Sequence, residues 1–351
     1  MDAVRWLVAV QSQDFAGAKW AVGTRVRGAT DAAIERAYDA GRILRTHVLR
    51  PTWHFILPAD IRWVLALTAP RVHAQNNHRY RALGLDATTF RRSHAALRKA
   101  LEGGHWQTRD ELRHVLRKSG VPTDNTDQRM AHIMMHAELD AVVCSGPRRG
   151  KQFTSLLDER APASKSVARD DAVVELARRF FASRWPATAQ DFAKWSGLTV
   201  ADGRTGLEAI GAPPRTRAAR EPGPVAHLLS IYDEYVSSYK DRSSMASSAD
   251  ARRLVSQGAA LYYITTIDGR VVGTWKRAAG ARGVSVRFQF FRKLAPAERR
   301  ALDHATRAGS PEFCGNGGKG MSGFSGRRRS RRFRNAANAA GEGPEALPLA
   351  S

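Results

Sequence analysis

The sequence predicts an α+β protein in which three tandem winged-helix units are followed by a small β-domain. Helical segments near the start of the chain lead into two short strands, which is the order of elements in a winged helix. A helix–turn–helix pattern then recurs in two further blocks. Beyond residue 224 the spacing of apolar residues changes from helical to alternating, which is typical of strands.

Composition narrows the class of protein. The chain has 351 residues, which is enough for two or three domains, and a formal net charge of +23. The positive electrostatic field of so basic a chain attracts polyanions. Nucleic acid is the first partner to expect, and an acidic membrane surface is the second. The two cysteines, Cys144 and Cys314, cannot form a disulfide framework. Because the sequence has neither a signal-peptide pattern nor an apolar run of about eighteen residues, we expect a soluble, cytoplasmic, nucleoid-associated protein.

The first predicted winged helix covers residues 1–80 and is short at its N-terminus. Residues 30–41 predict a helix with a threonine cap and a glycine stop. Residues 43–50 and 52–57 predict two strands around a proline. Pro58 then opens another helix, because proline at a first-turn position loses no hydrogen bond.

The second predicted winged helix covers residues 81–165. Thr108 and Glu111 form a capping box, in which each side chain satisfies a free backbone donor of the other residue. A second helix is predicted over residues 128–140. A short strand pair then flanks the basic turn at residues 146–151.

The third predicted winged helix covers residues 166–215. Thr188 caps one helix, residues 195–198 make a turn that contains glycine, and Thr199 caps the next helix. The spacing resembles that of the second block, which indicates a weak internal repeat.

The β-domain is predicted over residues 222–305, after a linker rich in Pro, Gly and Arg. Residues 261–276 predict a hairpin with an Asp-Gly turn, and residues 284–290 alternate as a half-buried strand does. Residues 310–351 form a basic tail that we expect to be disordered, because it cannot build a core.

The stretch from Trp6 to Trp20 is the most unusual in the chain. It places Gln11, Gln13 and Asp14 directly against apolar residues. Such side chains are buried only when their polar atoms find partners, so the cluster is either a satisfied helix terminus capped by Asp14 or a functional site.

Two patterns match known ligand-binding motifs in part, and neither predicts a binding site here. Residues 315–320 match the dinucleotide-binding glycine pattern but lack its preceding strand and following helix. His132 and His136 are one helical turn apart, as in zinc proteases, but Ile133 stands where the catalytic glutamate would be. With no third ligand evident in the sequence, we expect no metal site and no cofactor.

Four motifs in order suggest a family. They are Val10–Asp14, Arg45–His54, Asp191–Leu198, and Tyr232–Tyr235 together with Tyr239–Ser243. With these motifs, about residues 1–300 resemble the AlkZ/YcaQ-type proteins, the bacterial crosslink-repair DNA glycosylases. The resemblance implies three tandem winged helices, a C-terminal β-barrel, and a catalytic Gln-x-Gln motif that maps onto Gln11 and Gln13.

Two neutral amides suit the chemistry that the resemblance implies. An N-alkylated purine already carries positive charge, so it leaves without a general acid. An amide oxygen can orient the attacking water and stabilise positive charge on the sugar. Asp14 is then a base, or it holds Gln11 and Gln13 in place.

Duplex DNA is the expected partner, with no membrane and no obligate protein partner, and we expect a monomer. The candidate DNA-binding residues lie in the second and fourth motifs and at the basic turn: Arg45, His47, Arg50, Thr52, His54, Arg148, Arg149, Lys151, Lys240 and Arg242. A noncatalytic DNA-binding protein, either a regulator or a resistance factor that shields DNA, remains the alternative. An RNA-binding protein is a third interpretation, because charge alone does not separate the two nucleic acids.

Overall fold

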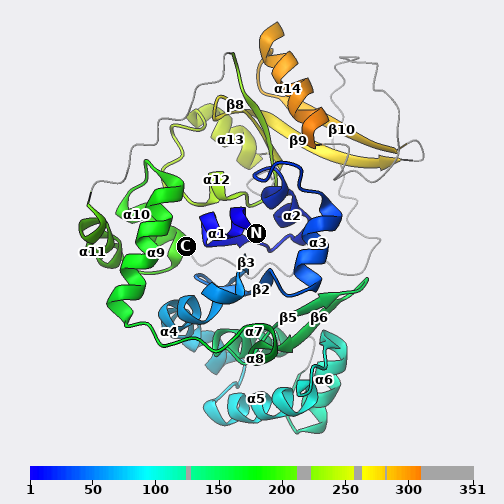
Figure 1. Cartoon of the computed structure of the whole chain (residues 1–351), viewed down its shortest axis with the longest axis vertical. Helices are drawn as coiled ribbons and strands as arrows, with labels where there is room; N and C mark the ends of the chain where they lie inside the picture. Colours follow the sequence, from blue (N-terminus) through cyan, green and yellow to red (C-terminus); the bar gives the residue numbers. More distant parts are fainter. Residues whose placement is uncertain (124–127, 212–222, 257–262, 281–282, 310–351) are drawn as a thin grey trace. The chain divides into compact units, whose positions relative to one another are not determined.

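The computed structural model describes residues 1–123, 128–211, 223–256, 263–280 and 283–309 as a mixed α+β fold (Figure 1). The basic tail at residues 310–351 and the predicted linker lie outside the described residues, apart from the linker's ends. None of the described helices has the length and apolar character needed to cross a membrane.

The first block is a three-stranded antiparallel sheet with the strand order β1-β3-β2, surrounded by helices. The strands are β1 (Ala9–Gln11), β2 (Leu44–Val48) and β3 (Thr52–Ile56). The helices are α1 (Asp2–Leu7), α2 (Phe15–Gly23), α3 (Asp31–Asp39) and α4 (Pro58–Ala82). The predicted helix at 30–41 and both predicted strands are confirmed, with ends trimmed by one or two residues, and Thr30 caps α3 as expected.

The second block also pairs helices with a three-stranded antiparallel sheet, here in the order β4-β6-β5. Its helices are α5 (Ala87–Leu101), α6 (Arg109–Lys118), α7 (Arg129–Leu139) and α8 (Leu157–Arg160). Its strands are β4 (Gln107–Thr108), β5 (Val143–Arg148) and β6 (Gln152–Leu156). The capping box of Thr108 and Glu111 is present, and the basic turn joins β5 to β6 as predicted.

The third block consists of helices α9 (Arg169–Arg184), α10 (Ala189–Ser196) and α11 (Val200–Ile210). Thr188 and Thr199 cap their helices as predicted, and in each case the structure shows a full capping box with the aspartate three residues later. Residues 166–211 contain no strand, so this block shows the helix–turn–helix pattern without a wing.

The C-terminal block carries an antiparallel sheet with the strand order β10-β9-β8-β7. Its strands are β7 (Ala226–Leu229), β8 (Tyr263–Ile267), β9 (Arg270–Gly280) and β10 (Gly283–Phe290); its helices are α12 (Glu234–Ser237), α13 (Ser248–Ser256) and α14 (Pro296–Gly309). The predicted hairpin forms, with positive φ at Asp268 and Gly269. The expected barrel is not found: over the described residues the sheet is open, because β7 and β10 each pair on one side only.

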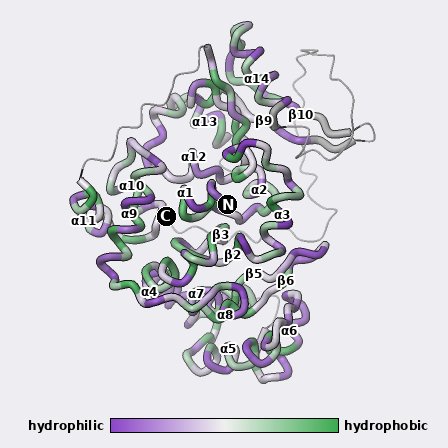
Figure 2. The backbone as a smooth tube through the Cα atoms, viewed as in Figure 1, coloured by the Kyte–Doolittle hydropathy of each residue, from purple (hydrophilic) through white to green (hydrophobic). Residues whose placement is uncertain are grey.

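One hydrophobic core runs through the first three blocks. It includes Val8, Leu65, Leu97 and Trp195, so the predicted units at 1–80, 81–165 and 166–215 are packed into a single body. In Figure 2 hydrophobic and hydrophilic residues alternate along α5, α6 and α14, as expected of helices with one apolar face.

Trp20 is the main apolar contact of the start of the chain with the β-domain. Trp20 of α2 lies in the apolar cluster of the C-terminal sheet, with its ring 5.0 Å from that of Trp275. Its indole N–H donates to the carbonyl of Leu228 at 2.7 Å. The stretch that contains Gln11, Gln13 and Asp14 is therefore held between the first sheet and the β-domain.

Candidate functional site

Gln11 ends strand β1 and faces His54 across the antiparallel pairing with β3. Directly after it, the main-chain N–H of Ser12 donates to the carbonyl of Trp53 at 2.7 Å. Asp14 then caps α2 by accepting a hydrogen bond from the N–H of Gly17. The interpretation of Asp14 as a helix cap is therefore confirmed, while Gln11 still belongs to strand β1.

The Gln11 side chain is only 8% exposed. Its carbonyl oxygen Oε1 is buried and has no hydrogen-bond partner among the described atoms. The hydroxyl of Ser12 is also buried without a hydrogen-bond partner among the described atoms. Buried polar atoms without partners are rare, and each one calls for an explanation, such as a water molecule, a bound ligand or a catalytic role. Gln13 beside them is half-buried.

Glu234 is the centre of the hydrogen-bond network around this stretch. Its Oε1 accepts from the main-chain N–H of Gln11 at 2.8 Å. Its Oε2 accepts from Arg184 at 2.9 Å, from the indole N–H of Trp195 at 3.0 Å and from the hydroxyl of Ser238 at 3.1 Å. Burial, the largest single influence, would raise the pKa of this carboxyl, but the charge of Arg184 and the hydrogen bonds from Arg184 and Gln11 together help to lower it. Glu234 is therefore a buried carboxylate with four donors.

Two further contacts bring the sequence motifs together. Arg45 donates through Nε to the carbonyl of Ser12 at 3.0 Å, and its guanidinium lies over the Trp53 ring at 4.2 Å. Asp191 accepts from the main-chain N–H of Lys240 at 2.6 Å. The four segments recognised in the sequence thus meet around the opening stretch.

Gly197 explains the third motif. It ends α10 with φ of 75°. A Cβ at this position would lie 2.5 Å from the carbonyl oxygen of Leu49, so only glycine lets the turn approach the connection between β2 and β3 this closely.

The two histidines predicted to bind DNA are buried. His47 contacts the Glu138 carboxylate at 2.6 Å through Nδ1 and stacks near Trp53. His54 is completely buried, and this burial, together with the charge of Arg50, lowers its pKa to about 4. The His54 ring is therefore neutral at pH 7, with Nε2 unpartnered among the described atoms.

Asp14 lies near two phenols of the β-domain. Burial and the charge of Asp14 raise the pKa of Tyr263 to about 12 and also raise that of Tyr232. Asp14 therefore lies near two neutral phenols, and the amides of Gln11 and Gln13 precede it in the same stretch of chain. This set can accept and relay protons and stabilise positive charge.

The remaining predicted DNA-binding residues occupy two places. Arg148, Arg149 and Lys151 lie at the turn of the β5–β6 hairpin, with Arg149 and Lys151 exposed. Lys240 and Arg242 are exposed after α12, while Arg50 and Thr52 are half-buried at the connection of β2 and β3.

Positive charges are concentrated at the second place. Burial, together with the charges of Arg242 and Arg50, lowers the pKa of Lys194 to about 8. The ammonium of Lys194 donates to the carbonyls of Ser237 and Tyr239. Three cations that disfavour one another in this way form a site that an anion would stabilise.

Comparison with known proteins identifies the family. The profile described as DNA glycosylase AlkZ-like matches residues 4–309. The chain belongs to the AlkZ-like DNA glycosylase family. An interstrand DNA cross-link repair glycosylase of Streptomyces sahachiroi is 24% identical to it over 305 residues, which are 78% of this chain and 81% of that protein.

A solved structure agrees with the fold of this AlkZ-like chain. The Streptomyces sahachiroi DNA glycosylase AlkZ matches it with a TM-score of 0.70 at 22% identity, over 88% of this chain and 90% of that one. At this identity the likeness establishes the mixed α+β fold.

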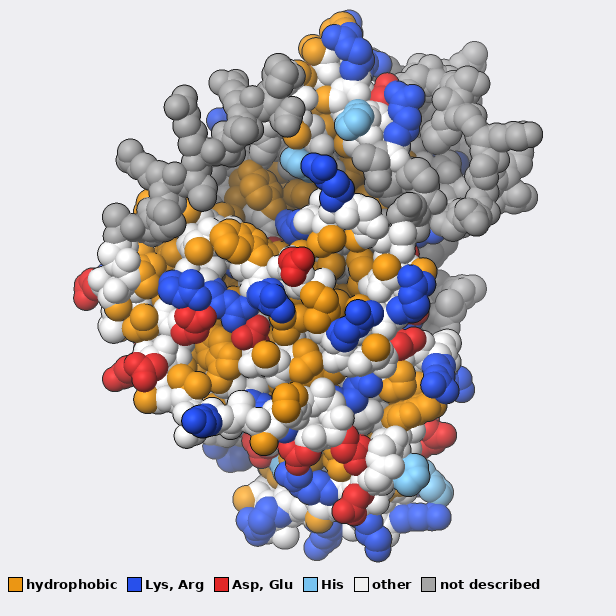
Figure 3. All heavy atoms as spheres, in the orientation of Figure 1, with side chains coloured by type: hydrophobic (Ala, Val, Ile, Leu, Met, Phe, Trp, Pro, Cys, Tyr) orange, Lys and Arg blue, Asp and Glu red, His pale blue; other side chains and the backbone are white. Residues whose placement is uncertain are grey.

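Sequence reasoning missed three features of the AlkZ-like chain. It did not identify Arg184, nor the bidentate pair of Arg25 with Asp233, whose closer contact is 2.6 Å. It also missed a cationic surface on α5 and α6, visible as blue side chains at the bottom of Figure 3. Its exposed members include Arg91, Arg92, Arg98, Lys99, Arg117 and Lys118. A count of Lys and Arg per helix would have indicated this surface.

Proposed function

We propose that this AlkZ-like DNA glycosylase hydrolyses the N-glycosidic bond of N-alkylated purines in duplex DNA, with Gln11 and Gln13 as the catalytic residues. The observation that carries the proposal is the buried, unpartnered carbonyl oxygen of Gln11, held beside Glu234 where the four motifs meet. A preorganised acceptor of this kind stabilises charge without reorganisation during the reaction.

In the proposed mechanism, the amide oxygens of Gln11 and Gln13 orient a water molecule toward C1′ of the alkylated nucleotide. The water oxygen forms a bond to C1′ as the bond from C1′ to the base nitrogen breaks. The electron pair of the broken bond neutralises the cationic base, which leaves as a neutral purine. Asp14 takes the proton that the water loses, since its pairing with the Gly17 N–H leaves acceptor capacity on the carboxylate.

The burial of His54 supports this division of roles. Since its pKa is lowered to about 4, the ring adds no positive charge beside a cationic sugar that develops in the transition state. We assign Arg45, His47 and His54 to positioning the Gln11 segment, because all three side chains are buried within the fold.

DNA contacts are proposed for the exposed cations. Lys240 and Arg242, together with half-buried Arg50 and Thr52, would bind the backbone of the lesion strand beside the Gln11 site, where the positive charges are concentrated. Arg149 and Lys151 would reach a neighbouring phosphate from the tip of the hairpin, with Arg148 behind them over the Phe15 ring. This use of the hairpin accords with the winged-helix arrangement that we propose for the first two blocks.

Crosslinked purines are the proposed subset of substrates. The Streptomyces relative is described as an interstrand cross-link repair glycosylase, and it matches most of this chain. A crosslink joins two alkylated bases, so each half presents the same cationic leaving group as a simple alkylated purine.

The test is release of free base from duplex DNA that carries N7-methylguanine. The wild-type chain should release the base, and Gln11→Ala/Gln13→Ala should reduce the rate by at least about 100-fold, the usual effect of losing a transition-state hydrogen-bond acceptor or donor. Gln75→Ala, an exposed glutamine on α4, is the matched control and should leave the rate unchanged. Salt-sensitive binding of duplex DNA without release of any base, including from crosslinked DNA, would favour the noncatalytic DNA-binding protein instead.

A further inference from the structure

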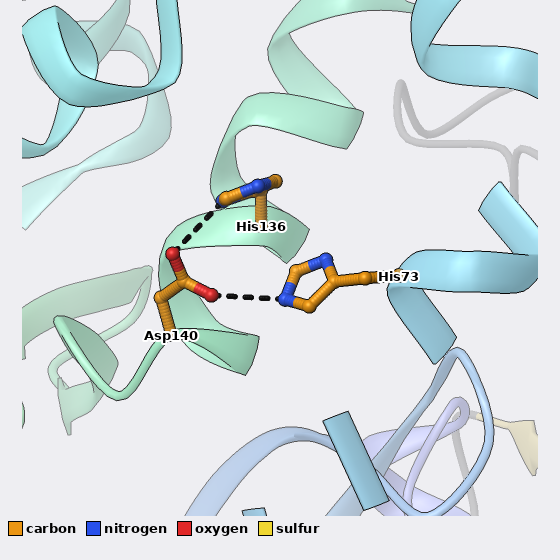
Figure 4. Close-up of side chains that lie close together, drawn as sticks. All are labelled: His73, His136 and Asp140. Carbon is orange, nitrogen blue, oxygen red and sulfur yellow. Dashed lines mark hydrogen bonds and ion pairs between the residues drawn. The ribbon is translucent and has the colours of Figure 1, made fainter. Parts of the chain in front are cut away.

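Three side chains from two helices meet outside the Gln11 site (Figure 4). His73 comes from α4, His136 comes from α7, and Asp140 caps the end of α7. The Nε2 atom of His73 lies 2.9 Å from Oδ1 of Asp140, and Nδ1 of His136 lies 3.4 Å from Oδ2. One donor atom from each of the three residues lies within 4.8 Å of the others.

A third imidazole adjoins this cluster. His94 of α5 places Nε2 at 3.3 Å from Nδ1 of His136, and its Nδ1 lies 3.8 Å from Oδ2 of Asp140. The sequence offered only the pair His132 and His136. The structure separates that pair, because Nδ1 of His132 lies 3.0 Å from the carbonyl of Gln128. The other ligands come from α4 and from the end of α7.

The donor atoms of His73, His136 and Asp140 are spaced as zinc ligands can be. Bonds of roughly 2.0–2.1 Å to nitrogen and oxygen place the ligand atoms of a tetrahedron roughly 3.3–3.4 Å apart. The separation of His136 Nδ1 from Asp140 Oδ2 is 3.4 Å, and the three donor atoms lie within 4.8 Å of one another. His94 contacts the other residues through two different ring nitrogens, so it adjoins the site as a neighbour of its ligands.

The surroundings hold both imidazoles in orientations that suit ligation. The hydroxyl of Tyr80 lies 3.3 Å from Nδ1 of His73, which leaves Nε2 of that ring for a metal. Phe90 stacks on the His136 ring at 3.5 Å and fixes its plane.

We propose that His73, His136 and Asp140 bind one Zn²⁺ ion, with a fourth position open to water. Two imidazoles and one carboxylate form a donor set suited to zinc, whereas Mg²⁺ and Ca²⁺ prefer oxygen ligands alone. The Asp140 side chain is 39% exposed, so an ion can enter from solvent. The bound ion joins α4 of the first block to α7 of the second, at a place the Gln11 chemistry does not use.

The experiment uses the full chain, purified without a polyhistidine tag and stripped of metal with a chelator. Titration with ZnCl₂ should show one ion per chain with a dissociation constant below about 1 μM, and should raise the melting temperature. Co²⁺ in the same site should give the intense visible absorption of tetrahedral coordination. His136→Ala and the conservative Asp140→Asn should each weaken zinc binding by at least about tenfold, the smallest effect expected even of an outer-shell partner.

His78→Ala removes an exposed histidine from the same helix α4 and is the matched control. It should bind zinc like the wild-type chain. Circular dichroism of the metal-free variants shows whether each one is folded, and the Asn variant keeps the shape of Asp140. Equal zinc binding by the wild-type chain and Asp140→Asn, a stoichiometry other than one, or no binding below about 1 μM would overturn the proposal.

Discussion

The main-chain N–H of Gln11 donates a 2.8 Å hydrogen bond to Oε1 of Glu234, which lies 223 residues further along the chain. The other oxygen of the same carboxylate binds Arg184 and Trp195 of the third block. One buried side chain therefore fixes where the first strand ends relative to both the helical blocks and the β-domain. This contact connects the stability of the fold to the geometry of the proposed catalytic glutamines.

Glu234→Gln should unfold far more easily than the wild-type chain. The substitution keeps the shape of the side chain, but it removes the charge that compensates Arg184 and directs an amide N–H₂ at other donors. Breaking a buried ion pair in this way costs about 3–5 kcal/mol. Urea unfolding followed by circular dichroism measures the difference.

The matched control for this substitution is Glu208→Gln, which changes an exposed carboxylate on α11 and should shift the free energy of unfolding by less than about 0.5 kcal/mol. If both variants unfolded at the same urea concentration, the central role of Glu234 would be wrong.

Gly197→Ala should destabilise the chain through its approach to the β2–β3 connection. Alanine with φ of 75° costs about 1–2 kcal/mol wherever it occurs. At this position its Cβ would also lie 2.5 Å from the carbonyl oxygen of Leu49. Gly28 has a similar φ of 70°, but a Cβ there would meet nothing within 4 Å. Gly28→Ala should therefore show only the cost of placing alanine at a positive φ. Thermal unfolding of the two variants should therefore differ clearly, and equal melting temperatures would contradict the close approach.

Local elements were predictable from the sequence because their causes are local. The three capping boxes begin at Thr108, Thr188 and Thr199, and each satisfies backbone donors within three residues. The residues that form them are therefore close in sequence, and the helix starts can be predicted without knowing the fold. The Asp-Gly hairpin turn is predictable for the same reason. The winged-helix assignment and its boundaries go further than these local signals and remain predictions.

The site was less predictable because its partners are distant in sequence. The adjacent acids Asp233 and Glu234 are both buried in ion pairs, and their partners are Arg25 and Arg184. Each partner lies at least 50 residues away in sequence, so the pairing could not be found from the local pattern. Burial also changes the meaning of His54, which the motif alone could not show because desolvation depends on the packed core. The roles of Gln11 and Gln13 stay predictions.

The free energy of unfolding should decrease as the pH falls below about 6.5, and part of this decrease should depend on His54. Above pH 6.5 the ring is neutral in both the folded and the unfolded chain. Between pH 6.5 and about 4 the unfolded chain takes up a proton that the folded chain excludes, so stability decreases as the pH falls. The difference between the two pKa values corresponds to about 3 kcal/mol at the acid end.

Urea unfolding as a function of pH measures this dependence. His54→Gln removes the titrating group and should flatten the profile between pH 6.5 and 4, whatever its stability at pH 7. His78→Gln, an exposed histidine on α4, should leave the profile as in the wild-type chain. A profile of His54→Gln as steep as that of the wild type would show that the His54 ring titrates normally.

The exposed cations at the hairpin tip should contribute to binding without contributing to chemistry. If Arg149 and Lys151 each neutralise one phosphate, Arg149→Gln/Lys151→Gln should reduce the slope of log affinity against log salt by about 1.8. Base release at saturating DNA should stay unchanged, because the hairpin makes no contact with the reacting sugar in the proposed mechanism. Fluorescence anisotropy of a labelled duplex at several salt concentrations measures the slope.

The control variant is Lys165→Gln/Arg204→Gln, which removes two exposed charges from segments to which no DNA contact is assigned. It should leave the slope closer to that of the wild type. Equal slopes for the two double variants would remove the hairpin tip from the DNA interface and leave Lys240 and Arg242 as the proposed phosphate contacts.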